Sequence, residues 1–117
     1  MKLNHVNLTV TDVQAAKAFL ETYFGLRDLD AGEGRQNFAA LMDDGGLVLT
    51  LMKAGSRQTV AYPATFHIGF GQESEAQVDA LNERLRADGF AVEPPARHHA
   101  WTFYVQAPGG FTVEVMA

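Results

Sequence analysis

The sequence predicts an α+β fold of two βαβββ modules, whose strands form a curved mixed sheet around a cavity. Two internal repeats indicate this. The stretch Asp44-Gly45-Gly46-Leu47-Val48-Leu49-Thr50-Leu51-Met52 recurs as Pro108-Gly109-Gly110-Phe111-Thr112-Val113-Glu114-Val115-Met116, and Asn4-His5-Val6-Asn7-Leu8 recurs as Phe66-His67-Ile68-Gly69-Phe70. We therefore expect one domain made of a first module over 1–52, a linker over 53–63 and a second module over 64–117.

The first half of the chain shows the order strand, helix and three strands. Residues 3–10 alternate between apolar and polar side chains, which is typical of a half-buried strand. Thr11-Asp12 offers an N-cap, and a helical apolar stripe follows and ends before Gly25. Beyond it we expect a short strand over 26–31, a turn over 32–34, and a hairpin of strands 36–42 and 47–52.

The second half repeats this order. We expect a strand over 65–71, an N-cap at Ser74, and a helix that ends near Gly89. A short strand is predicted over 90–93, where Pro94-Pro95 would stop it. The closing hairpin pairs strands 101–106 and 111–116.

Composition excludes several classes of function. With 117 residues, 47% of them hydrophobic, the chain can bury the core of one globular domain. A net charge of −5 argues against nucleic acid as a partner. The chain has no cysteine, so any metal site must use histidine and carboxylate ligands. Neither a signal peptide nor a membrane-spanning apolar run is recognisable, which predicts a cytoplasmic protein without a membrane partner.

Strand alternation places three ligand-type side chains on polar faces. His5, His67 and Glu114 each lie opposite the apolar set of their predicted strand. A single strand histidine is usually just solvated or hydrogen-bonded, but these two histidines occupy equivalent positions of the repeat. Two imidazoles and one carboxylate suit one divalent ion (Fe, Mn, Ni or Zn) and leave coordination positions open for a substrate.

The whole chain resembles the vicinal oxygen chelate superfamily, which includes glyoxalase I, extradiol dioxygenases, fosfomycin-resistance enzymes and bleomycin-binding proteins. The resemblance implies paired βαβββ modules around one metal, often in a homodimer whose subunits share the site. His5 can then come from a different chain than His67 and Glu114. The motifs that carry it are Leu3-Asn4-His5-Val6, Thr11-Asp12, Ala18-Phe19-Leu20, Tyr23-Phe24-Gly25-Leu26, Phe66-His67-Ile68 and Phe103-Tyr104-Val105-Gln106-Ala107-Pro108-Gly109-Gly110.

The sequence also departs from particular branches of this family. Sites of the glyoxalase I type have a fourth ligand where Thr50 stands, and a hydroxyl is a poor ligand, so glyoxalase I proper is disfavoured. Fosfomycin-resistance enzymes resemble the chain at Tyr104, but usually have threonine where Asn7 stands and an arginine in a C-terminal extension that is missing here. His98 or His99 could supply a base, although a histidine pair in a loop is more often solvated.

Two functions follow as hypotheses. The first is a metal-dependent enzyme (a lyase or isomerase, a dioxygenase or an epoxide-opening transferase) whose small-molecule substrate chelates the metal through oxygens. Its metal ligands are His5, His67 and Glu114; Asn7, Thr50, Tyr104 and Trp101 bind substrate; Tyr104 and His99 are candidate catalytic residues. The alternative is a metal-free drug-binding protein similar to bleomycin-resistance proteins, in which Phe38, Tyr62, Trp101 and Tyr104 hold a flat cation. Metal content distinguishes the two.

Overall fold

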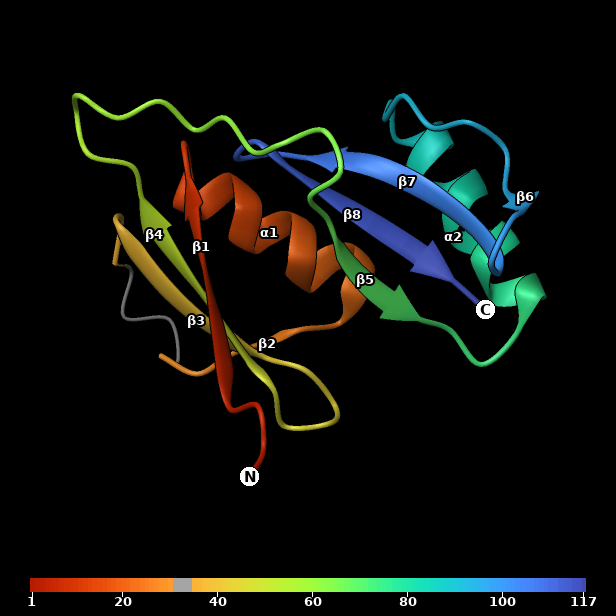
Figure 1. Cartoon of the computed structure of the whole chain (residues 1–117), viewed down its shortest axis with the longest axis horizontal. Helices are drawn as coiled ribbons and strands as arrows, with labels where there is room; N and C mark the ends of the chain where they lie inside the picture. The colour runs from red at the N-terminus through yellow and green to blue at the C-terminus, as the bar shows by residue number, and fades with distance from the viewer. Residues whose placement is uncertain (31–34) are drawn as a thin grey trace. The chain divides into compact units, whose positions relative to one another are not determined.

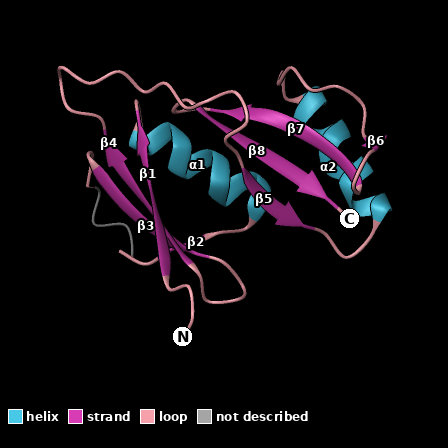
Figure 2. Cartoon of the chain, viewed as in Figure 1, coloured by secondary structure: helices cyan, strands magenta, loops and turns pink. Residues whose placement is uncertain are grey.

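The computed structural model describes residues 1–30 and 35–117, so the predicted turn over 32–34 and Ala31, the end of the predicted strand, lie outside the described residues. Its elements follow in the order βαβββ twice (Figures 1 and 2). They are β1 (His5–Val10), α1 (Val13–Phe24), β2 (Arg27–Asp28), β3 (Phe38–Met42), β4 (Val48–Lys53), β5 (Ile68–Gly71), α2 (Glu75–Ala87), β6 (Ala96–Arg97), β7 (Trp101–Ala107) and β8 (Phe111–Met116).

The chain divides into two compact units. The first comprises Met1–Tyr62 with Pro108–Gly110, and the second comprises Pro63–Ala107 with Phe111–Ala117. Each unit holds one helix and one four-stranded mixed sheet, so the predicted α+β class is confirmed.

In the first unit the strand order is β1-β4-β3-β2, with β1 parallel to β4 and the other pairs antiparallel. Helix α1 begins at the predicted cap, because the Asp12 carboxylate accepts from the backbone N–H of Ala15. It ends at Gly25, whose φ of 65° suits a residue without a Cβ. The helix packs on β3 and β4. The buried apolar side chains of this unit include Leu8, Val10, Val13, Ala16, Phe19, Leu20, Leu41, Leu49 and Leu51.

In the second unit the order is β5-β8-β7-β6, and β5 is parallel to β8. Helix α2 starts at Ser74, whose hydroxyl accepts from the backbone N–H of Gln77, and it packs on β7 and β8. Its buried face contains one polar side chain, Asn82, which donates to Glu93 O at 2.8 Å. The buried apolar side chains here include Val78, Leu85, Phe103, Val105, Phe111, Val113 and Val115.

Three predicted strands differ from the structure. Of the strand predicted over 26–31, the described residues contain only Arg27–Asp28 as strand β2. The strand predicted over 65–71 begins only at Ile68, because a turn precedes it in which the N–H of Phe66 donates to Pro63 O. The strand predicted over 90–93 is wrong. The short strand β6 instead follows the two prolines and pairs with the start of β7, and the N–H of Phe90 is used at the end of α2 by Leu85 O.

Membrane insertion through a helix finds no support in the part of the chain that is described. Neither α1 nor α2 is long and apolar enough to cross a bilayer.

Candidate functional site

The polar centre of the second unit is the carboxylate of Glu114 on β8. Strand register places Glu114 between Tyr104 of β7 and Gly69 of β5, so these three positions share one row across the sheet. The residue is only 3% exposed, which is unusual for glutamate and requires polar partners. The neighbouring strands and one loop supply those partners.

One carboxylate oxygen, Oε1, is surrounded by potential donors. The Tyr104 hydroxyl donates to it at 3.0 Å, and Nε2 of His99 lies 2.8 Å away. The hydroxyl of Thr102 also lies 2.8 Å from Oε1, but the same oxygen is 2.8 Å from Val115 O. Because a hydroxyl has a single proton, Thr102 must share it between two acceptors.

The other oxygen, Oε2, has a different environment. Nε2 of His67 lies 3.2 Å from it. Gly69 adds no side chain on this side, and a Cβ at that position would stand 3.8 Å from Oε2. Oε2 is therefore the more open of the two oxygens, with one imidazole beside it.

The hydrogen bond made by the other ring nitrogen of His67, Nδ1, limits the protonation states open to Nε2. Nδ1 lies 3.0 Å from the backbone carbonyl oxygen of Thr65, which can only accept, so Nδ1 carries a proton. Nε2 then either holds a second proton, which forms an ion pair with Glu114, or directs its lone pair to the carboxylate. Two lone pairs that face each other at 3.2 Å repel unless a cation binds both.

The spacing of these two atoms fits a shared ion. Ligand atoms bonded at about 2.1 Å lie about 3.0 Å apart on an octahedral edge and about 3.4 Å apart on a tetrahedral one. The separation of 3.2 Å between His67 Nε2 and Glu114 Oε2 lies between these values. A carbonyl oxygen behind the ligating imidazole is the usual support of a metal-binding histidine. The pair therefore fits a divalent ion.

The surroundings also favour the ionised form of Glu114. Burial raises the pKa of the carboxyl group, but hydrogen bonds from Thr102 and Tyr104 and the electrostatic influence of the neighbouring His99 and His67 imidazoles outweigh it, so the net pKa lies below the ordinary value. Burial raises the pKa of Tyr104, and its hydrogen bond to Glu114 adds to this. Tyr104 is thus a phenol that donates to an anion.

The other predicted site residues of the first module lie in the first unit. The Thr50 hydroxyl donates to Oδ1 of Asn7 at 2.8 Å, across the paired strands β1 and β4. Nδ1 of His5 lies 3.1 Å from Oδ1 of Asn4. Over residues 1–30 and 35–117, no group of three histidine or acidic side chains is arranged to hold an ion. The structure thus brings His67 and Glu114 together, whereas the ligand role of His5 stays a prediction.

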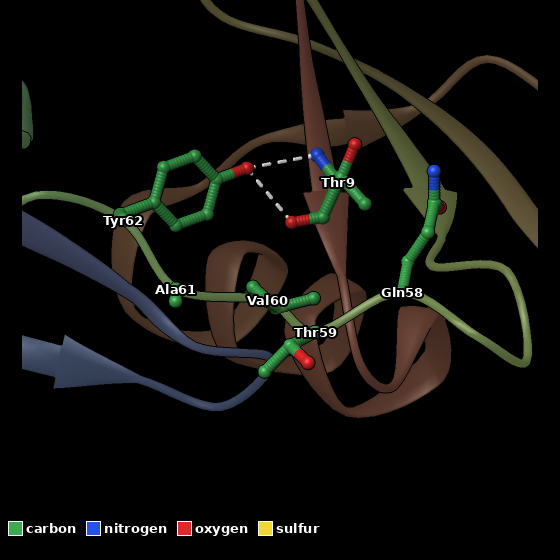
Figure 3. A pocket seen from close by; sticks show the side chains of 6 residues that line it. All are labelled: Thr9, Gln58, Thr59, Val60, Ala61 and Tyr62. Atoms are coloured by element: carbon green, nitrogen blue, oxygen red, sulfur yellow. Dashed lines mark hydrogen bonds between the residues drawn. The ribbon is translucent and has the colours of Figure 1, made fainter.

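Two predicted aromatic residues have other partners. The indole N–H of Trp101 donates to Asp79 of α2 at 2.7 Å, and the Arg97 guanidinium lies over its ring. The Tyr62 hydroxyl accepts from the N–H of Thr9 and donates to Thr9 O, at 2.9 and 2.8 Å (Figure 3). Thr9, Tyr62 and residues 58–61 line an open pocket of about 370 Å³ in the first unit, and Tyr62 is the titratable side chain among these lining residues.

Sequence reasoning missed three contributors to the Glu114 environment: Thr65, Gly69 and Thr102. Alternation indicates that Thr102 lies on the polar face, but its contact with Glu114 depends on cross-strand register. The role of Thr65 depends on its main-chain oxygen, which no side-chain pattern reveals. His98 and His99 are equivalent in the sequence, whereas only His99 contacts Glu114 in the structure.

Comparisons with known proteins identify the family. The model of the Glyoxalase/Bleomycin resistance protein/Dioxygenase superfamily matches residues 2–115. A structure described as a possible glyoxalase from Bacillus cereus is 57% identical, with a TM-score of 0.89 over 100% of this chain and 99% of that chain. An uncharacterized Pseudomonas aeruginosa protein is 32% identical over 80% of this chain and 69% of its own length.

A more distant structure was solved with ligands. It is a mutant of the fosfomycin resistance protein FosX from Listeria monocytogenes, complexed with Mn(II) and 1S,2S-dihydroxypropylphosphonic acid. It is 25% identical, with a TM-score of 0.75 over 99% of this chain and 89% of that one. With the family model covering nearly the whole chain, this protein belongs to the glyoxalase/bleomycin resistance/dioxygenase superfamily.

Proposed function

We propose that the protein is a metal-dependent enzyme of the glyoxalase/dioxygenase-like type, which acts on a small substrate that chelates the metal through oxygens. The observation that carries this proposal is the separation of 3.2 Å between His67 Nε2 and Glu114 Oε2, with the proton of His67 on Nδ1. The Mn(II) in the Listeria protein supports a divalent ion in this family.

His67 and Glu114 would hold the ion together with His5 as third ligand. When bound, a divalent ion supplies Lewis-acid stabilisation of negative charge that develops on a substrate oxygen. Among the metals that two imidazoles and a carboxylate accept are Fe, Mn, Ni and Zn.

Tyr104 is the proposed substrate-orienting residue of the second unit. Its side chain is 42% exposed, so a small molecule can reach it, and its raised pKa keeps the hydroxyl proton available for donation. Asn7 and Thr50 form a hydrogen-bonded pair on the first sheet and are the corresponding proposed contacts there. For the indole N–H of Trp101 to bind substrate, it would have to exchange its hydrogen bond to Asp79 for one to the substrate.

Metal binding tests the proposal. Protein purified without chelator and then titrated with Mn²⁺ should bind one ion per chain, and His67→Ala or Glu114→Gln should abolish this binding. His98→Ala is the matched control, because His98 is an exposed histidine outside the proposed ligand set. If none of Fe²⁺, Mn²⁺, Ni²⁺ and Zn²⁺ binds to the wild-type protein, the enzyme proposal fails and the drug-binding alternative replaces it.

We further propose a homodimer in which the subunits share the site, as the family resemblance implies. Mixing His5→Ala protein with His67→Ala protein tests this directly. If His5 and His67 of one site come from different chains, each mixed dimer regains one intact site and binds Mn²⁺. If they come from the same chain, mixing restores no binding.

A further inference from the structure

The two carboxylate oxygens of Glu114 differ in the number of their polar neighbours. Within the described part of the chain, Oε1 has three polar neighbours, from a loop and from β7, whereas Oε2 has the His67 ring alone. This asymmetry determines which oxygen is available to a cation, because each carboxylate oxygen has about two lone-pair positions.

Two of the Oε1 neighbours are donors without a competing acceptor in the described residues. Within those residues, the Tyr104 hydroxyl donates to Oε1 alone, and Nε2 of His99 has no second hydrogen bond or ion pair. Thr102 divides its single proton between Oε1 and Val115 O. Tyr104 and His99 thus fill the lone-pair positions of Oε1.

His99 differs from Tyr104 in where it lies. It is part of the loop between β6 and β7, and its side chain is 55% exposed, so packing does not explain why its ring is held. Among residues 1–30 and 35–117, the polar partner of its side chain is Oε1 of Glu114, at 2.8 Å. A carboxylate oxygen carries no proton, so Nε2 of His99 must carry one to be held at this distance, and a protonated nitrogen has no lone pair for a metal.

From this geometry we infer that His99 is a positioning residue: by donating to Oε1, it fixes the Glu114 carboxylate so that the ion is bound through Oε2 alone. The inference rests on the proposed metal-dependent function and deepens it. Without His99, Oε1 keeps the Tyr104 hydroxyl and the shared proton of Thr102, but one of its lone-pair positions opens and the carboxylate can offer both oxygens to the ion. Gly69 completes the arrangement, because it leaves the space next to Oε2 open.

Substitution of His99 tests the inference through metal affinity and spectrum rather than through activity. His99→Leu removes the donor, and we expect it to weaken Mn²⁺ binding by about 10- to 100-fold, the usual effect of losing a group that orients a ligand. The absorption spectrum of the Co²⁺-loaded protein should change, because a carboxylate that binds through both oxygens alters the coordination number. His99→Gln keeps an N–H donor and should restore both the affinity and the spectrum close to the wild type.

Two further variants sharpen the experiment. His98→Leu is the matched control for an exposed loop histidine and should leave affinity and spectrum unchanged. Gly69→Val replaces glycine by a good strand former, so the protein should fold, but the added side chain should crowd Oε2 and lower the affinity for Mn²⁺. Urea unfolding of each variant verifies that the fold is intact.

The outcomes separate the possible errors. If His99→Leu binds Mn²⁺ as tightly as the wild type, the positioning role is overturned while the metal site stands. If His99→Gln is as weak as His99→Leu, an N–H donor at this position does not restore the site and the positioning role is overturned. If the wild-type protein binds no divalent ion, the proposed function fails and this inference fails with it.

Discussion

Gly109 provides a quantitative test of the first unit. Its φ is +104°, and a Cβ on this residue would stand 3.0 Å from Val10 Cβ and 3.2 Å from Ala16 Cβ. Val10 and Ala16 are both fully buried, one on β1 and one on α1, so neither can move aside easily. The N–H of Thr11 donates to Gly109 O at 3.0 Å, which holds the backbone in place.

The expected cost of Gly109→Ala has two parts. A non-glycine residue at such a positive φ costs about 1–3 kcal/mol. Overpacking of a core costs about 1–3 kcal/mol more. We therefore expect Gly109→Ala to lower the free energy of unfolding by about 2–6 kcal/mol, a large fraction of the roughly 5–15 kcal/mol of a typical domain.

A second glycine separates the two parts. Gly89 has a φ of +94°, but a Cβ there would meet nothing within 4 Å, so Gly89→Ala includes the backbone strain without the overlap. Urea unfolding followed by far-UV circular dichroism gives both free energies. If Gly109→Ala is no more destabilising than Gly89→Ala, the packing described between β1, α1 and residues 108–110 is wrong.

Three further predictions concern polar side chains. Because the pKa of Glu114 is held below its ordinary value of 4.5, its stabilising contribution is fully present above that pH and is lost as the pH falls through the lowered pKa of the folded protein. Glu114→Gln should therefore flatten the urea-stability profile below pH 4.5. Asn82→Ala leaves Glu93 O without its donor and should cost about 1–3 kcal/mol in urea unfolding. Thr50→Glu should add the missing fourth ligand and raise the Mn²⁺ affinity by about tenfold or more in calorimetric titration; unchanged affinity would refute the equivalence of Thr50 and Glu114.

The sequence predicts the parts of the fold that local signals determine. Asp12 and Gly25 delimit α1 because a cap and a positive φ are properties of single residues. The βαβββ order follows from the repeat, and the mixed sheets follow from that order. The position of the short strand after α2 could not be predicted correctly. Ala96 and Arg97 form β6 because they pair with Thr102 and Trp101, and their own composition does not indicate a strand.

Prediction of the site is limited in the same way. Alternation and the repeat select Glu114 and His67, which the structure places 3.2 Å apart. The polar partners of Glu114 include Tyr104, directly across the ladder, and His99 in a loop, and neither contact has a local signal in the sequence. The hydrogen bond from Trp101 to Asp79 likewise depends on tertiary packing, because Asp79 lies on α2.

A crystal structure of Mn²⁺-loaded protein, with anomalous scattering recorded, tests the central claim most directly. We expect an anomalous peak about 2.1 Å from both His67 Nε2 and Glu114 Oε2, with Oε1 still in contact with Tyr104 and His99. A peak bound elsewhere on the chain, or a loaded crystal in which His67 and Glu114 contact only each other, would contradict it.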